Sequence, residues 1–364
     1  MKKILLQHYK DYPQAKLQDF FKFIHQSEFG PAHLISNPKE NFKRLKSEFA
    51  QLDPLTKDKI VDFLQPNLCR LHLQVLTQSS LNITTLQRFF ELSTTPRGTV
   101  DSYYEKIEIL KELCIEDVLP FTEIEVNRFK DEIGDSPLLP FRHSKNYRLA
   151  YAPAYRVVEK RFYDVLPLFS RIDELMSKNE HVVVAIDGDC AAGKTTLAKL
   201  LKDVYNCNII HMDHFFLRPE QRTKERLIEP GGNIDYERFD SEVLVHLNTK
   251  NSFSYRPFNC TTQDFDPAIS LSNNKLTIIE GSYSHHPVLT KNYDLKVFLS
   301  IPEDVQLERI LKRNGHVMYE KFKNIWIPME KTFESAFNIR KNSHLEFDYV
   351  DNYLKYMNSH GKDF

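Results

Sequence analysis

One octapeptide constrains this chain more than any other feature. It reads Gly188-Asp189-Cys190-Ala191-Ala192-Gly193-Lys194-Thr195, which has the spacing G-x-x-x-x-G-K-[ST] of a phosphate-binding loop, or P-loop. An apolar run at 181–186 precedes it and leucines at helical spacing follow it, so a strand, a tight loop and a helix are expected in that order. A glycine turn between a strand and a helix is the alternative interpretation.

The chemistry of a phosphate site explains the residue types of this loop. Glycines let successive backbone N–H groups surround an anion, and the helix that follows directs its positive N-terminal end at the same point. Residues 188–196 are therefore expected to bind a nucleoside triphosphate, and Thr196 closes that segment. Lys194 supplies a charge for the β- and γ-phosphates, and the Thr195 hydroxyl is a candidate Mg²⁺ ligand.

The residues after 180 alternate between strand and helix patterns. Short apolar runs at 181–186, 208–212, 276–280 and 295–299 are separated by segments with helical periodicity. Strands that alternate with helices form a mostly parallel sheet covered on both faces. We therefore expect residues 179–364 to adopt an α/β fold, a P-loop NTPase-type parallel sheet with flanking helices.

The first 150 residues have a different pattern. Apolar positions recur at helical spacing, breakers such as Gly30-Pro31 separate the segments, and no clear alternating strand is visible. A mostly α-helical N-terminal domain, whose role the sequence leaves open, is expected over 1–150. A connector is expected over 151–178, with a linking helix from about Arg156 to Lys178.

Composition narrows the partners and the compartment. Lys and Arg number 49 and Asp and Glu 50, a net charge of −1, which gives no electrostatic reason to expect nucleic acid or an anionic membrane as a main partner. No apolar run reaches the roughly 18 residues of a membrane span, and the first residues do not read as a signal peptide. The 5 cysteines are scattered without CxxC spacing, which favours a reducing cytoplasm.

Three further positions are candidates for the chemistry. Asp213 ends the second strand, where open α/β sheets bind ligands, so it is a candidate base for an attacking hydroxyl or a Mg²⁺ ligand. Glu280 follows four apolar residues, a layout typical of an acid that positions a metal ion. Arg309 and Arg313 lie four apart on one helix and suit a phosphate clamp. The simpler alternatives are a helix N-cap, a solvated strand end and a solvated basic face.

Residues from about 180 to 350 resemble the uridine kinase and phosphoribulokinase-type P-loop kinases. The matching segments, in the same order and spacing, are 186–196, 212–216, 232–240, 278–281 and 294–313. The resemblance implies that Asp213 is the catalytic base, that Glu280 assists the metal and that Arg309 and Arg313 belong to the lid. It also implies an acceptor pocket at 233–240 and 255–259, lined by Asp235, Tyr236, Arg238, Tyr255 and Phe258.

The resemblance implies transfer of a phosphoryl group from ATP·Mg²⁺ to a hydroxyl of a small molecule, foremost a nucleoside. In the family a histidine and then a proline follow the aspartate, whereas here Tyr236 follows Asp235 and the proline is absent. A kinase of another small alcohol is therefore one alternative, and an ATP-binding regulator without turnover is another. A GTPase or ABC-type ATPase is disfavoured because neither signature is present. ATP or GTP preference and oligomeric state stay open, a homo-oligomer included.

Three other features are weaker. His25, Glu28 and His33 surround a helix–turn and could bind a divalent metal, with His143 as a further ligand, although hydrogen-bonded structural histidines are the simpler interpretation. Cys190 is a candidate oxidation-sensitive thiol, or only a small residue in the loop. The stretch 326–330 is aromatic and is expected to pack in a core rather than stack on a base.

Overall fold

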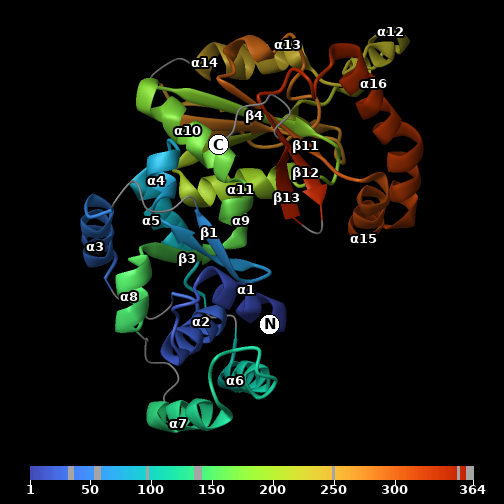
Figure 1. Ribbon diagram of the computed structural model, residues 1–364. Helices are drawn as coiled ribbons and strands as arrows, with labels where there is room; N and C mark the ends of the chain where they lie inside the picture. The colour runs from blue at the N-terminus through green and yellow to red at the C-terminus, as the bar shows by residue number, and fades with distance from the viewer. Residues whose placement is uncertain are drawn as a thin grey trace. The chain divides into compact units, whose positions relative to one another are not determined.

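The computed structural model describes residues 1–31, 37–52, 59–95, 98–134, 142–247, 251–350 and 353–357. The chain divides into two compact units, Met1–Tyr163 and Asp164–Phe364 (Figure 1). The segment 151–178, expected as a connector, is thus divided between the two units.

A six-stranded sheet of order β13-β12-β11-β4-β10-β5 forms the centre of the C-terminal unit. Its strands are β4 (Val182–Gly188), β5 (Cys207–His211), β10 (Leu276–Glu280), β11 (Leu295–Ser300), β12 (Leu345–Val350) and β13 (Tyr353–Met357). All neighbours pair in parallel except β13, which pairs antiparallel with β12 at one edge. The expected α/β fold is confirmed, and four of the strands lie where the apolar runs predicted them.

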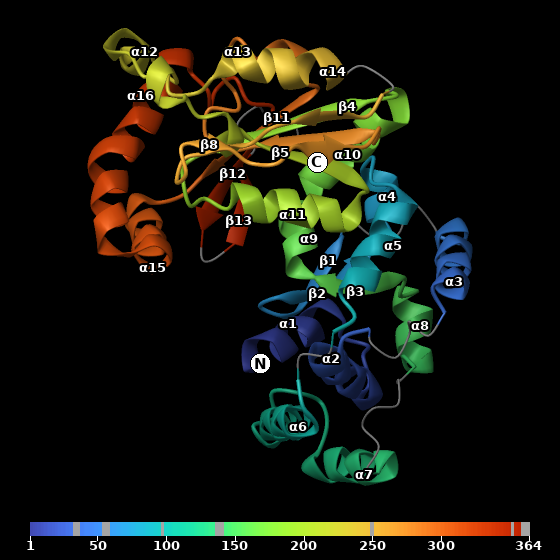
Figure 2. The same ribbon diagram turned by 180° about the vertical axis from the view of Figure 1, so that it is seen from behind.

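Helices cover both faces of this sheet. Figures 1 and 2 show α10 (Leu166–Lys178) and α11 (Lys194–Val204) on one face, with α13 (Tyr236–Phe239) and α14 (Val245–Leu247) on the other. Every residue of β4 and β10 is buried, as expected of strands covered on both sides. Two longer helices follow β11, α15 (Glu303–Lys321) and α16 (Ile327–Phe337), joined by the π-helical turn η6 (Phe322–Trp326).

Short elements complete the C-terminal unit. The one-turn elements are η2 (Met212–Phe215), η3 (Pro219–Gln221), α12 (Lys224–Ile228), η4 (Asp240–Leu244) and η5 (Thr290–Asn292). Two small antiparallel pairs join β6 (Phe253–Tyr255) to β9 (Ile269–Leu271) and β7 (Phe258–Asn259) to β8 (Asp264–Phe265). Trp326 is half-buried and its ring meets Phe322 edge-on at 4.6 Å between centroids, a packing contact.

The N-terminal unit is mostly helical but also contains a sheet. Its helices are α1 (Lys2–Asp11), α2 (Leu17–Phe29), α3 (Pro38–Ala50), α4 (Val75–Gln78), α5 (Ile83–Leu92), α6 (Val100–Ile115), α7 (Glu123–Ile133), α8 (Lys145–Tyr151) and α9 (Lys160–Asp164). The strands β1 (Val61–Gln65), β2 (Leu68–His72) and β3 (Tyr155–Glu159) form an antiparallel sheet of order β1-β2-β3.

The mostly helical fold expected for this half is confirmed, but two details differ. Strands are present although no strand pattern was visible, and the expected linking helix is wrong at its start, where the residues from Arg156 to Glu159 form β3. All five residues of β2 are buried, including Arg70 and His72, so the strand shows neither the alternation nor the apolar run by which strands are recognised. The β-branched Val157 and Val158 pair with β2 and hold the third strand in place.

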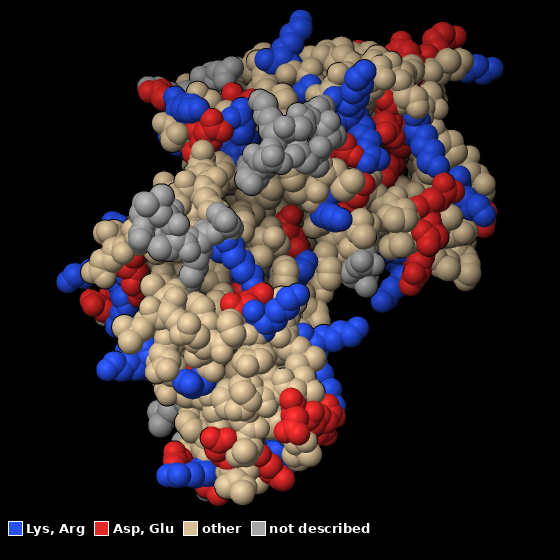
Figure 3. Space-filling view, viewed as in Figure 1, with Lys and Arg blue, Asp and Glu red and all other residues tan. Residues whose placement is uncertain are grey.

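Charged side chains are mixed over the surface. Figure 3 shows acidic and basic groups interspersed on the visible face of each unit, in keeping with the net charge of −1. In the part of the chain that the structure describes, every helix is too short or too polar to span a bilayer.

Candidate active site

The P-loop joins the end of β4 to the start of α11. Gly188 has φ 129°, and a Cβ there would lie 1.9 Å from the Leu299 carbonyl oxygen, so packing against β11 requires glycine. Gly193 has φ 106° and caps α11, and a Cβ there would meet nothing within 4 Å. The loop thus leaves open space in front of the helix N-terminus, where an anion can sit.

Unpaired backbone amides line that space. The first hydrogen bond of α11 runs from Leu197 N–H to the Gly193 carbonyl, so the preceding amides, those of Lys194 to Thr196, have no acceptor within the helix. Lys194 is buried, and its Nζ donates to the carbonyls of Gly188 (2.6 Å) and Asp189 (3.0 Å). A nucleotide phosphate would fit these donors, with Lys194 turning from the carbonyls toward it.

A hydroxyl and two carboxylates lie beside the loop. The register of the sheet places Glu280, the last residue of β10, between Ile186 on β4 and His211 on β5. Thr195 Oγ1 donates to the buried Glu280 carboxylate at 3.1 Å, and His211 Nδ1 bonds the same carboxylate from the other side. Oxygen ligands of this kind suit Mg²⁺, which needs only one or two protein ligands beside phosphates and water.

Asp213 begins the turn η2, directly after β5, and its side chain is exposed. The pKa of the Asp213 carboxyl is raised above its ordinary value. Loss of hydration is the largest cause, the charge of Lys194 opposes it, and the charge of Glu280 adds to it. Asp213, Glu280 and the P-loop follow β5, β10 and β4, three neighbouring parallel strands, so they lie at the same edge of the sheet. An exposed carboxylate in this position is accessible to a hydroxyl.

Helix α15 places one arginine at the P-loop. Arg309 donates from Nη1 to the Ala191 carbonyl at 2.9 Å and stacks on the Tyr349 ring, with Cζ 3.8 Å from the centroid. Arg313 is exposed and donates to the Asn314 side chain at 2.7 Å, while its charge lowers the pKa of Asp213. The expected pair is thus divided, because Arg309 contacts the loop and Arg313 contacts its own helix.

The residues expected at the acceptor pocket are tied into the fold. Asp235 is buried and caps α13, accepting from Arg238 N at 3.1 Å. Arg238 lies over the Phe215 ring at 4.2 Å, and Tyr236 bonds Arg226, whose guanidinium lies 3.7 Å above the Tyr236 ring centre.

Two aromatic residues of the expected pocket lie near η2. Tyr255 hydroxyl lies 3.0 Å from His214 Nδ1, and Phe258 is buried on β7, which pairs with β8. Burial lowers the pKa of His214 to about 4, so this histidine is neutral at pH 7. His214 was not singled out from the sequence, although it follows Asp213 directly.

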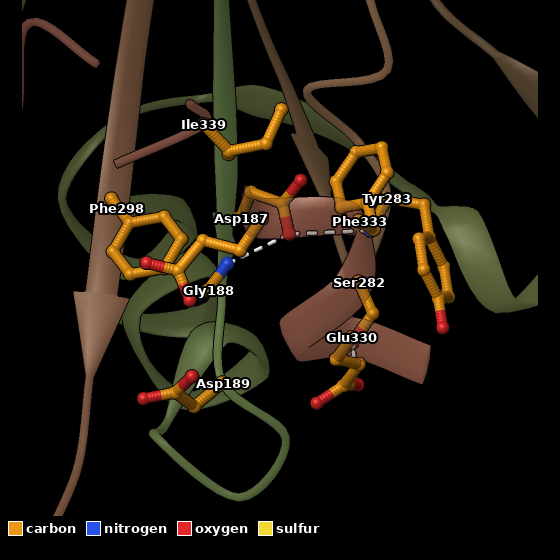
Figure 4. Close-up of a pocket in the computed structure, with 10 residues that line it drawn as sticks. Asp187, Gly188, Asp189, Ser282, Tyr283, Phe298, Glu330, Phe333 and Ile339 are labelled. Atoms are coloured by element: carbon orange, nitrogen blue, oxygen red, sulfur yellow. Dashed lines mark hydrogen bonds between the residues drawn. The ribbon is translucent and has the colours of Figure 1, made fainter. Parts of the chain in front are cut away.

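A small pocket behind the P-loop contains residues that motif spacing did not indicate (Figure 4). Asp187 is buried at the end of β4 and accepts from the N–H groups of Gly188, Tyr283 and His285 at 2.7, 3.2 and 2.8 Å, which fixes the loop after β10. Loss of hydration raises the pKa of Asp187 to about 6. Asp187 belongs to the segment that carries the family resemblance, which is the signal that could have identified it.

Helix α16 contacts the same loop through Glu330, which also bonds Ser282. Glu330 Oε2 accepts from Cys190 N–H at 3.0 Å, and its Oε1 accepts from Ser282 Oγ at 2.6 Å, as Figure 4 shows for Ser282 and Glu330. Ser282 Oγ lies 3.2 Å from Lys194 Nζ. A carboxylate therefore takes one of the loop amides that an anion would use. Burial raises the pKa of Cys190, so the thiol is protonated at neutral pH and a poor candidate for oxidation.

The suggested metal site of the N-terminal half is not formed by the described residues. Glu28 pairs with Lys106 and accepts a hydrogen bond from Ser102 Oγ. The ring of His25 lies tilted against that of Phe29, with 5.0 Å between the ring centroids. His33 lies outside the described residues. Among those described, no group of three or more His, Cys, Asp or Glu side chains is arranged to hold a metal ion.

Comparison with known proteins agrees with this geometry. Residues 183–318 match the family described as Phosphoribulokinase / Uridine kinase family. The chain is 23% identical over 181 residues to nicotinamide riboside kinase of Saccharomyces cerevisiae, covering 42% of this chain and 72% of the yeast protein.

Two solved structures are also similar to part of the chain. A possible uridine kinase from Bacillus stearothermophilus is 20% identical, covers 43% of this chain and 96% of its own, and has a TM-score of 0.31. D-glycerate 3-kinase from Cryptococcus neoformans is 14% identical, covers 50% and 92%, and has a TM-score of 0.37. The family match over residues 183–318 confirms the resemblance seen in the sequence and supports a P-loop kinase.

Proposed function

We propose that this kinase transfers the γ-phosphoryl group of ATP to the hydroxyl of a small molecule, foremost a nucleoside, with Asp213 as the base. The observation that carries the proposal is the placement of Asp213, Glu280 and Lys194 at the carboxyl ends of three neighbouring parallel strands. Open α/β sheets bind ligands at this edge. This placement supports Asp213 as the proton acceptor and Lys194 as the phosphate-binding lysine.

Each residue has a distinct task in this proposal. The amides of Lys194 and Thr195 and the Lys194 ammonium bind the phosphates, while Thr195 and Glu280 would hold Mg²⁺. When bound, the metal ion neutralises charge on the phosphates. His211 orients Glu280 through its hydrogen bond. Asp213 accepts the proton of the attacking hydroxyl, and the rest of the catalysis comes from positioning and charge neutralisation.

The lid residues act on the transferred group. Arg309 already contacts the loop at the Ala191 carbonyl, which supports a role beside the phosphates. Arg313 acts on the same region through its charge and would approach once a triphosphate is present. Gly315, with φ 74°, interrupts α15 and gives the helix a point at which to bend.

A nucleoside is the favoured acceptor because the yeast relative is named for a riboside and the matched family for uridine. Asp235, Tyr236, Arg238, Tyr255 and Phe258 are the proposed acceptor-side residues, and the neutral His214 beside Tyr255 adds a polar group there. A different small alcohol is the nearest alternative, since Tyr236 is engaged by Arg226 rather than open to a ribose.

The test is an acceptor screen. Purified protein with ATP and MgCl₂ is given nucleosides, ribosides and small polyols, and ADP release and the phosphorylated product are both measured. We expect acceptor-dependent ADP release that Asp213→Asn abolishes while ATP binding persists. ATP binding without turnover on any acceptor would instead favour a regulator, and near-normal turnover by Asp213→Asn would remove the assigned base.

A further inference from the structure

The interior of the N-terminal unit contains a polar cluster that no part of the phosphoryl-transfer site uses. Helix α2 turns one face toward β2 and β3, and this face carries Asp19, Lys22, Phe23 and Gln26 at helical spacing. At its centre is Arg70 on β2, whose side chain is fully buried, with 0% of its surface exposed. A wholly buried arginine is rare unless its charge is paired.

The surroundings of Arg70 bind only part of its guanidinium. Nε donates to Gln26 Oε1 at 2.9 Å, and the rings of Phe23 and Tyr155 lie over the guanidinium, with Cζ 4.9 and 4.8 Å from their centres. The two terminal nitrogens, Nη1 and Nη2, have no hydrogen-bond acceptor within the described chain. These are the two atoms with which arginine binds a carboxylate or phosphate bidentately.

The neighbouring carboxylates are used elsewhere. Asp62 accepts from Tyr12 Oη at 2.7 Å, lies 2.8 Å from His72 Nε2 and pairs with Lys59 at 2.6 Å. Asp62 is thus hydrogen-bonded by groups other than Arg70, although Arg70 is its partner in the register of β1 and β2 and each charge favours the other.

Asp19 is engaged in the same way. It lies 2.8 Å from His143 Nδ1 and accepts from Ser144 N and Oγ at 3.0 and 2.6 Å. No described carboxylate forms an ion pair with Arg70. Asp62, its partner in the register of β1 and β2, acts on Arg70 only through its charge, so the two terminal nitrogens keep no described acceptor.

Other donors and charges point the same way. His8 Nε2 and His72 Nδ1 are buried and have no hydrogen-bond partner among the described residues. The ring of His8 lies 4.4 Å from that of Phe23, which covers Arg70. Burial and the charge of Arg70 lower the pKa of Lys22 to about 8, which places a second cation within electrostatic reach. The cluster therefore holds several buried nitrogens without a described hydrogen-bond acceptor, beside the two carboxylates that are engaged elsewhere.

We propose that this cluster is a binding site for a small oxyanion, a carboxylate or phosphate group, held by the terminal nitrogens of Arg70. Buried donors without an acceptor are costly, and unpartnered buried polar atoms in a folded protein usually mark a missing water or ion. An oxyanion with two acceptor oxygens would satisfy both terminal nitrogens at once, and the guanidinium already packs against the rings of Phe23 and Tyr155.

The test must separate this site from the P-loop, which also binds phosphate. The parent chain for the test is therefore full-length Lys194→Met. Inorganic phosphate and sodium acetate are titrated into it, each against sodium chloride of equal ionic strength, and the melting temperature and the heat of binding are recorded. We expect saturable binding of one or both probes. Phosphate alone would indicate a phosphorylated ligand, and acetate alone a carboxylate.

Two substitutions assign the binding to the guanidinium. In the Lys194→Met parent, the added substitution Arg70→Met should weaken the affinity for the anion by about tenfold or more, because the charge-assisted bidentate contact is lost. Arg70→Lys keeps the charge without the fork and should weaken it by a smaller factor, and it serves if the methionine variant does not fold. The matched control is Arg128→Met on α7, an exposed arginine paired at the surface with Glu132, which should leave binding unchanged.

The proposal is overturned by either of two results. One is the absence of saturable binding of both probes to the Lys194→Met chain. The other is binding that Arg70→Met and Arg70→Lys leave as strong as in the parent. Neither result bears on phosphoryl transfer, which the acceptor screen tests separately.

Discussion

The two units bury charged side chains in different places. In the C-terminal unit Asp187, Lys194 and Glu280 lie together at one end of the sheet, and each has hydrogen-bond partners in the loops beside it. In the N-terminal unit Asp62 and Arg70 lie inside, between helices and a three-stranded sheet, and the arginine keeps two unpartnered nitrogens. The first arrangement follows from topology, since parallel strands bring their carboxyl ends to one edge. The burial of Asp62 and Arg70 in the N-terminal unit does not follow from such a rule of topology.

The two proposals assign these regions different roles. The edge of the parallel sheet carries an exposed acid and a buried acid beside the P-loop lysine, which is why we propose phosphoryl transfer there. The interior cluster of the N-terminal unit has buried donors but no exposed acid within its described contacts, which suits binding rather than catalysis. Each prediction below tests one side of this comparison, from the largest expected effect to the smallest.

The largest effect is expected from Asp213→Asn. If phosphoryl transfer belongs to the C-terminal edge, loss of the base should lower kcat by roughly 10²–10⁴-fold, since asparagine cannot accept the hydroxyl proton. The dissociation constant for ATP should change by less than about twofold, because Asp213 makes no contact with the P-loop amides. Steady-state ADP release and calorimetry of ATP binding measure the two quantities.

Two exposed controls accompany Asp213→Asn. Asp264→Asn on β8 removes a charge at the surface, and Arg128→Met changes the N-terminal unit. Both should keep the parental kcat. A comparable loss of kcat in Arg128→Met would show that chemistry is not confined to the C-terminal unit.

The difference between the two units also explains which strands could be predicted from the sequence. Strands β4, β5, β10 and β11 were found because strands buried on both faces are short apolar runs. Strand β2 was missed because it buries Arg70 and His72, and β12 because Glu346 and Asp348 interrupt it. Patterns of polarity detect an element only where burial and apolarity coincide.

For the site, the motif and the strand ends were enough to select the P-loop, Asp213 and Glu280. Ser282, Glu330 and His211 were not selected, because they reach the site through tertiary contacts between distant segments that no spacing encodes. The polar cluster around Arg70 is a similar case. It depends on strands that were themselves not predicted.

The next largest effect is expected inside the N-terminal unit, at the ion pair of Glu28 and Lys106. Their side chains are 4% and 19% exposed. Glu28→Gln leaves Lys106 without its counter-charge and should destabilise this unit by about 2–3 kcal/mol, somewhat below the value for a fully buried pair because Lys106 is partly solvated. Amide exchange of α2 and α6, followed by mass spectrometry, reports the loss locally.

The double variant Glu28→Gln/Lys106→Met is the control for that result. Removing both charges should recover part of the stability, since no unpaired cation is left. If the losses of stability in the two single variants simply add up in the double variant, the pair contributes through packing alone. That result would contradict the difference drawn between this ion pair and Arg70, whose terminal nitrogens have no described acceptor.

The pH dependence of stability should have opposite signs in the two units. Burial raises the pKa of Asp187 to about 6, so the folded C-terminal unit binds this proton more tightly than the unfolded chain does. Its contribution is fully present below the ordinary value near pH 4 and is lost as pH rises through 6. Urea unfolding followed by the fluorescence of Trp326, the only tryptophan, measures it.

In the N-terminal unit the sign reverses. Loss of hydration opposes ionisation of Asp62, but His72, Arg70 and Lys59 outweigh it and hold its pKa well below the ordinary value. Its contribution is therefore present above about pH 4 and is lost as pH falls below that. Asp187→Asn should flatten the C-terminal profile between pH 4 and 6, and Asp62→Asn should flatten the N-terminal exchange profile below pH 4. Parallel profiles in the two wild-type units would contradict the assignment.

The smallest effect concerns Glu330, the carboxylate that occupies a P-loop amide. A nucleotide phosphate and Glu330 compete for Cys190 N–H, and two like charges at this distance repel each other. Glu330→Gln should therefore tighten ADP binding by about threefold to tenfold, as calorimetry would show. Glu334→Gln is the matched control, because Glu334 lies one turn further along α16 and lines the same pocket without a described bond to the loop.

The direction of that change separates two roles for Glu330. Its bond to Ser282 also supports the serine that contacts Lys194, so a purely supporting role predicts weaker ADP binding in Glu330→Gln. Tighter binding means that Glu330 acts as an internal counter-ion for the loop, which the nucleotide must displace. The C-terminal unit would then satisfy its anion site from within its own chain, whereas no described carboxylate bonds the terminal nitrogens of Arg70, for which we propose an anion from outside.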